Sequence, residues 1–165
     1  MRQTSNRASN LPAVILGAGL LIGTLDISDA LIFYHLYAGV PPIRLLQNIA
    51  SGILGRDAFR YGLCSALLGL ALHFFIATTA GAIYILASRK LPLSRHPFFY
   101  GTIYGFSVYF VMNYLVLPLS RVAPRTLFPP PIPFINGIAA LIFCIGIPVA
   151  LIARHYIPSS DKPLA

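Results

Sequence analysis

The sequence predicts an all-α integral membrane protein: a four-helix antiparallel bundle with one interfacial amphipathic helix, folded as a single membrane domain over residues 1–165. Of its 165 residues, 57% are hydrophobic and only 10% are charged. The apolar residues gather into four runs, and each run is long enough to cross a bilayer. A water-soluble domain of this composition would expose large apolar patches, so the sequence excludes an ordinary soluble protein.

The first expected transmembrane helix covers residues 11–37 and carries Asp26 and Asp29, two of only four acidic residues in the chain. An acid at membrane depth is costly and usually has a partner or a function. Arg2 and Arg7 before an apolar run also resemble the start of a signal peptide. The apolar run resumes after the two acids, and we therefore expect an uncleaved helix.

Two prolines at 41 and 42 end this helix, because proline lacks a backbone donor and disfavours helix in the residue before it. Residues 43–56 then place apolar side chains at helical spacing, with mostly polar residues on the other face. The stretch is too short and too polar to span a bilayer. It is expected to form an amphipathic helix that lies in the membrane interface or folds partly back into the bundle. A cap on the bundle is the simpler role for it, and a binding role is the alternative.

Three further transmembrane helices are predicted at residues 58–87, 98–119 and 134–156. His73 lies near the middle of the first of these, and Asn113 lies deep in the second. The connection over residues 120–133 contains a run of prolines and is expected to be extended. Pro148 marks a place where the last helix should kink.

The Lys and Arg residues divide unevenly between the two ends of such a bundle. Those on the side of the termini are Arg2, Arg7, Arg89, Lys90, Arg95, Arg154 and Lys162, and those on the other side are Arg44, Arg56, Arg60, Arg121 and Arg125. The positive-inside rule then predicts cytoplasmic termini. The net charge of +8 is scattered between apolar runs, an arrangement that does not indicate a nucleic-acid partner.

Four polar side chains form a candidate intramembrane cluster. They are Asp26, Asp29, His73 and Asn113. With a rise of 1.5 Å per residue, Asp26 lies about 20 Å and Asn113 about 22 Å from the cytoplasmic ends of their helices, and His73 lies near the midplane. Asp29 is expected nearer the outer interface, within reach of Arg56 or Arg60.

Two interpretations of this cluster remain open. In the functional one, Asp26 and His73 exchange a proton or bind a cation or a small polar ligand. In the structural one, Asp26 is hydrogen-bonded to His73 or Asn113 and simply joins helices. Known catalytic motifs, a structural metal site and a haem site are not indicated, so we expect no enzyme activity and no cofactor.

Two runs, LHFFIATTAGAIYILA (72–87) and GTIYGFSVYFVMNYLVLPL (101–119), resemble small bacterial inner-membrane proteins of the YagU-like kind. The resemblance rests on His73, Tyr84, Gly101, Gly105, Asn113 and Pro118. It implies a bacterial inner membrane, multi-pass protein with no established enzymatic activity.

The leading hypothesis is a membrane protein that handles protons or a small polar solute, with Asp26 and His73 as the working pair. The alternative is a structural or accessory subunit that docks to a larger membrane partner, or to a second copy, through glycine-rich faces. Gly19-x-x-x-Gly23 and Gly101-x-x-x-Gly105 have the small-residue spacing that allows helices to approach closely.

Overall fold

The computed structural model describes residues 10–122 and 130–156, and these residues form helices with no β-strand. In chain order the elements are α2 (Leu11–Ala38), α3 (Pro42–Leu54), the 3-10 helix η1 (Gly55–Phe59), α4 (Gly62–Ser88), α5 (Pro97–Val111), the π-helical η2 (Met112–Val116), α6 (Leu117–Leu119), α7 (Pro131–Ala140), the π-helical η3 (Leu141–Gly146) and α8 (Ile147–Tyr156). The predicted all-α class is confirmed.

Four continuous helical stretches are long and apolar enough to cross a membrane. They are Leu11–Ala38 with 28 residues, Gly62–Ser88 with 27, Pro97–Leu119 with 23 and Pro131–Tyr156 with 26. Each exceeds the roughly 20 residues that a bilayer requires. Many of their large apolar side chains are exposed, for example Leu16, Phe75 and Phe143, as the surface of a membrane protein requires. The protein is therefore a multi-pass α-helical membrane protein.

Two helix starts differ from the sequence prediction, and each has a local cause. The second span begins at Gly62 and not near residue 58, because Gly55 and Gly62 adopt positive φ and bracket the 3-10 turn between them. The last span begins at Pro131 and not at residue 134. Proline is tolerated in the first turn of a helix, where the backbone N–H groups lack intrahelical partners. Half of the predicted extended connection, residues 123–129 of 120–133, lies outside the described residues, and its last three residues, 131–133, belong to α7 instead.

The third and fourth spans each contain a π-helical turn shortly before a proline. Met112–Val116 precedes Pro118, and Leu141–Gly146 precedes Pro148. Proline cannot donate a backbone hydrogen bond, and its ring clashes with the carbonyl four residues earlier. The wider π turn accommodates this clash without ending the helix. Both spans therefore remain continuous.

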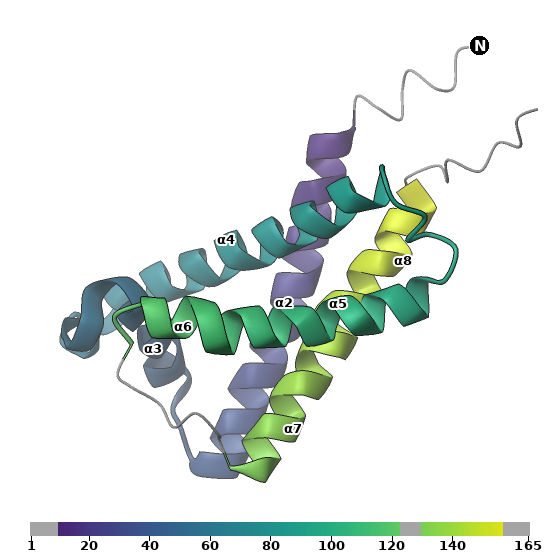
Figure 1. Ribbon diagram of the computed structural model, residues 1–165. Helices are drawn as coiled ribbons and strands as arrows, with labels where there is room; N and C mark the ends of the chain where they lie inside the picture. The colour runs from purple at the N-terminus through teal and green to yellow at the C-terminus, as the bar shows by residue number, and fades with distance from the viewer. Residues whose placement is uncertain (1–9, 123–129, 157–165) are drawn as a thin grey trace, which may run out of the picture.

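Glycines let the helices touch at two crossings. A Cβ on Gly19 of α2 would lie 2.6 Å from the Thr78 Cα of α4, and a Cβ on Gly105 of α5 would lie 2.6 Å from the Ile142 Cα of η3. Only glycine allows such close backbone approach. Figure 1 shows α4 crossing α2, and α5 crossing the α7–α8 span. A strictly antiparallel bundle stays a prediction.

α3 packs against the first half of α4. The backbone of Leu46 and Ala50 lies so close to Gly69 that a side chain there would overlap it. The Gln47 side-chain amide also donates to the Gly62 carbonyl at 2.9 Å. These contacts fix α3 beside α4, and its position at a membrane interface stays a prediction.

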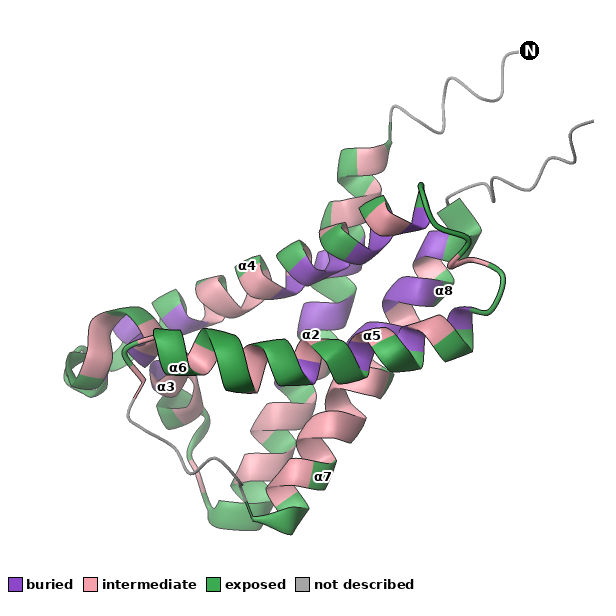
Figure 2. Cartoon of the chain, in the orientation of Figure 1, coloured by how far each residue is buried: buried purple, intermediate pink, exposed green. Residues whose placement is uncertain are grey.

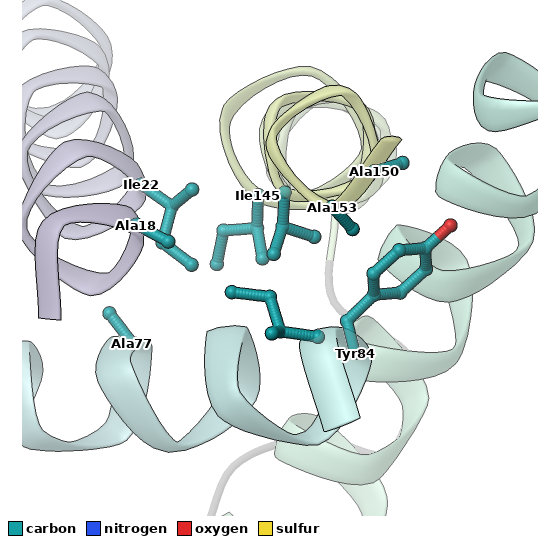
Figure 3. Close-up of a cluster of buried hydrophobic side chains, with 9 residues drawn as sticks. Ala18, Ile22, Ala77, Tyr84, Ile145, Ala150 and Ala153 are labelled. Carbon is teal, nitrogen blue, oxygen red and sulfur yellow. The ribbon is translucent and has the colours of Figure 1, made fainter. Parts of the chain in front are cut away.

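The buried core occupies one half of the molecule. The start of α2, the α4–α5 loop and the end of α8 lie toward the same end (Figure 1), and we call this part the terminal half. Its core consists of Ala18, Ile22, Ala77, Tyr84, Ile85, Ile145, Val149, Ala150 and Ala153, seven of which are labelled in Figure 3. In Figure 2, buried positions give way to intermediate and exposed ones along the second half of α2 and along α7. Other buried residues, such as Ala50, Ala58 and Ala66, lie where α3 and η1 pack against the start of α4, so the looser packing is found along the second half of α2 and along α7 and not throughout the opposite half.

The glycine crossings give a stability prediction. Gly105→Ala should lower the free energy of unfolding in detergent by about 1–3 kcal/mol, because the added Cβ forces the α5 and η3 backbones apart. Gly17→Ala is the matched control, since nothing lies within 4 Å of a Cβ at that position. The control should be neutral or more stable by up to about 1 kcal/mol from helix propensity. Denaturant unfolding followed by circular dichroism measures both; equal effects would contradict the close crossing.

Candidate functional site

A cavity of about 590 Å³ opens in the half opposite the termini, and we call it the central cavity. The second half of α2, α3, the middle of α4, the end of α5 through α6, and η3 all contribute to its wall. Ala77 and Ile145 belong both to this wall and to the core of the terminal half, so they form the boundary between the two. The volume lies within the range of about 300–1,000 Å³ that is typical of ligand sites.

The wall is mostly apolar and carries a few polar groups. Apolar side chains include Ile27, Ile49, Ile76, Val108, Met112 and Val116. The polar and charged side chains are Asp26, Tyr34, Arg44, Asn48, His73 and Ser120. Small-molecule sites commonly combine a large apolar surface with a few polar groups that orient the ligand.

His73 of α4 is fixed by a hydrogen bond to α2. Its Nε2 lies 2.8 Å from the backbone carbonyl oxygen of Gly23. A carbonyl only accepts, so Nε2 must carry the hydrogen and donate it. In the neutral ring, Nδ1 is then left as an acceptor. Gly23 allows α4 to come this close to α2. A Cβ at position 23 would lie only 2.8 Å from the ring of Phe74, the residue next to His73.

Asp26 follows Gly23 by three residues, about one turn of α2, and lines the central cavity together with His73. It makes no hydrogen bond or ion pair with any residue in the described ranges 10–122 and 130–156. Its carboxyl group thus faces an apolar space with His73 lining the same wall. The structure brings these two predicted site residues to one cavity.

Asp29 has a different partner from the predicted arginines. Its Oδ2 accepts a hydrogen bond of 3.1 Å from the side-chain amide of Asn136, which joins α2 to α7. Arg60 instead lies 3.7 Å from Asp57, in a pair whose two side chains are both well exposed. Arg56 is exposed on η1. The sequence signal for Asn136 is an amide within an apolar run, the same signal that singled out Asn113.

Asn113 does not meet Asp26 or His73 in the central cavity. Its side-chain amide donates to the Tyr109 carbonyl of its own helix at 2.9 Å, and it is not part of the cavity wall. Asn113 lies in the π-helical turn η2, where a changed hydrogen-bond ladder leaves backbone groups for side chains to satisfy. Of the four predicted residues, Asp26 and His73 share a site, while Asp29 and Asn113 each have a separate contact.

Sequence reasoning missed the contribution of α3 to the cavity. Arg44 and Asn48 lie four residues apart on one face of α3 and both line the wall. The polar face of the expected amphipathic helix was the available signal, but it favoured a cap on the bundle over a binding role for the helix. α3 packs onto α4 at Gly69, and His73 lies one turn farther along α4. The face of α3 that carries Arg44 and Asn48 therefore lines the same cavity as His73.

No three His, Cys or Asp side chains in the described part of the chain are grouped so that they could hold a metal ion. Comparisons with protein-family models, curated proteins and solved structures find no match to this chain. The likeness to YagU-like proteins therefore stays a prediction. The fold and the cavity define the class, a multi-pass α-helical membrane protein with an internal cavity.

The two asparagines should differ in their effect on stability. Asn136→Leu removes the interhelical bond to Asp29 and should cost about 1 kcal/mol in detergent unfolding. Asn113→Leu, the comparison variant, removes only a bond within its own helix and should change stability by less than about 0.5 kcal/mol. A larger loss for Asn113→Leu than for Asn136→Leu would contradict this assignment of the two contacts.

Proposed function

We propose that this protein binds a small solute inside the membrane, in the central cavity, with Asp26 and His73 as the polar contacts. The proposal describes a binding or transport protein and not an enzyme. The observation that carries it is the Asp26 carboxyl group, which lines a mostly apolar cavity without a hydrogen-bond or ion-pair partner among the described residues.

Asp29 provides the internal comparison. An acid that only joins helices has a protein partner, as Asp29 has Asn136. Asp26 lies one turn earlier on the same helix and is half-buried without such a partner in the described residues, and a polar group in apolar surroundings is destabilising unless it is hydrogen-bonded. A solute that hydrogen-bonds to Asp26 would offset that cost. This contrast supports a ligand-binding role for Asp26 over a purely structural one.

His73 suits a role beside Asp26. The bond from Nε2 to the Gly23 carbonyl fixes the ring and leaves Nδ1 as an acceptor. Histidine changes protonation readily near neutral pH. We include in the proposal that His73, whose Nδ1 can accept a proton, and Asp26 exchange a proton as the solute binds.

A simple proton channel has less support than solute binding. Ile22, Ile85 and Val149 are fully buried and fill the terminal half beyond the cavity. Apart from the hydroxyl groups of Tyr84 and Tyr104, the side chains of this core in the described residues are apolar. A cavity closed at one end supports a binding site that is accessible from the other.

The proposal extends to location. The resemblance to YagU-like proteins supports a bacterial inner membrane, and the seven Lys and Arg residues assigned to the side of the termini, against five on the other, support cytoplasmic termini. The shared position of the start of α2, the α4–α5 loop and the end of α8 in Figure 1 agrees with this arrangement. The central cavity then opens toward the outer half of the bilayer.

The accessory-subunit alternative has less support from the glycines that suggested it. Gly19, Gly23, Gly101 and Gly105 all contact other helices of the same chain. A partner or a second copy would have to use the exposed apolar side chains instead. Isolation of the protein with a stoichiometric membrane partner would favour this alternative.

An apolar carbodiimide tests access to the site. Dicyclohexylcarbodiimide adds to protonated carboxyl groups in apolar surroundings, and peptide mass spectrometry locates the adduct. In reconstituted vesicles Asp26 should be labelled at least about tenfold faster than Asp29, because only Asp26 lacks a protein partner. Asp26→Asn should remove the adduct, and Asp29→Asn should leave it.

A cavity-filling variant provides the control. Ile76→Trp places a larger side chain in the wall and should suppress labelling of Asp26. Phe75→Trp changes the neighbouring residue, which is 70% exposed, and should not. Labelling that is equal in these two variants, or that favours Asp29, would contradict the proposed site.

A further inference from the structure

We infer that the solute is an organic anion with an extended apolar body, and that Arg44 binds its anionic group. This inference rests on the proposed solute site at Asp26 and His73 and identifies the class of ligand. It follows from the distribution of charge along the wall of the central cavity.

Arg44 lines the cavity without a carboxylate partner. Its guanidinium lies 5.7 Å from the centroid of the Phe59 ring, which packs in the same wall. It forms no ion pair with an acid of the described ranges, whereas Arg60 pairs with Asp57. A guanidinium stacked on an aromatic ring keeps its N–H groups for a carboxylate, sulfonate or phosphate.

The two charged groups of the wall fix the direction of the ligand. Arg44 is exposed, whereas Asp26 and His73 are only partly exposed, so Arg44 lies nearer the opening. The Asp26 carboxyl group offers an anion no cationic partner in either protonation state, whereas the Arg44 guanidinium does. The anionic group therefore faces outward, and a neutral or basic group contacts Asp26 and His73.

The groups next to Arg44 also favour an anionic group of the ligand at this end of the cavity. Asn48 follows Arg44 by four residues on α3 and adds an amide donor to the wall. Arg121 lies beside α3, where its backbone N–H donates to the Gly52 carbonyl at 3.0 Å. Cationic groups around an opening raise the local concentration of anions. The apolar wall between Arg44 and Asp26 then receives the apolar body of the ligand.

A series of ligands with one alkyl chain and different head groups tests this inference. The protein is placed in nanodiscs of uncharged phosphatidylcholine, and binding of radiolabelled decanesulfonate is measured above that of empty nanodiscs. Unlabelled decanesulfonate should compete at least about tenfold better than decanol or decyltrimethylammonium, as a charge-assisted hydrogen bond implies. Arg44→Gln should remove most of this preference.

Arg56→Gln is the matched control, since Arg56 is an exposed arginine on the adjoining η1 and is not part of the cavity wall. It should keep the preference for the sulfonate. Methanesulfonate has the same sulfonate group but no alkyl chain, and it should compete poorly. This comparison distinguishes an amphiphile that enters from the membrane from a free anion in solution. Equal competition by methanesulfonate, or an unchanged preference in Arg44→Gln, would overturn the inference.

The results also separate this inference from the proposed function. If decanol or decyltrimethylammonium binds best and Ile76→Trp abolishes that binding, the cavity is a solute site but the anionic ligand is wrong. If no decyl compound binds and Asp26 also resists the carbodiimide, the solute site itself is wrong.

Discussion

Close backbone contact between crossing helices is the constraint on which this structure depends. Gly19 of α2 meets α4, and Gly105 of α5 meets η3, at distances that leave no room for a side chain. In lipid, helices associate through such packing because burial of apolar surface provides little driving force. Helices that cross must separate beyond the crossing. In the terminal half that space is filled by Ile22, Ile85 and other core residues, and in the opposite half it remains as the central cavity.

Polar groups in a membrane must find partners, and this requirement organises the rest of the site. The Tyr104 hydroxyl donates to the Ala80 carbonyl of α4 at 2.7 Å, and His73 donates to the Gly23 carbonyl of α2. Both bonds join different helices through a backbone oxygen. Asp26 differs from these two because it lines the central cavity without a hydrogen-bond partner among the described residues. That difference connects the packing of the fold to the proposed binding of a solute.

The sequence was sufficient for the four spans, because continuous apolar runs of bilayer length report directly on the solvent around them. It was also sufficient to bring Asp26 and His73 to similar depth. Depth alone could not exclude Asn113, because rotation about a helix axis and the π turn at η2 decide which way a side chain faces. The role of Arg44 was equally hidden, since it depends on how α3 packs onto α4 at Gly69.

A central cavity closed on the side of the termini by the packed core would be reached only from the opposite side. Two positions on α4 test this: Ile76 lines the cavity and Ile85 is fully buried in the core. Single cysteines are introduced at each position in a chain whose Cys64 and Cys144 are replaced by alanine, and a membrane-impermeant methanethiosulfonate is applied to either face of oriented vesicles. The account predicts that Ile76→Cys reacts from the face opposite the termini only and that Ile85→Cys reacts from neither. Equal reaction at both positions, or reaction of Ile76→Cys from the terminal face, would contradict it.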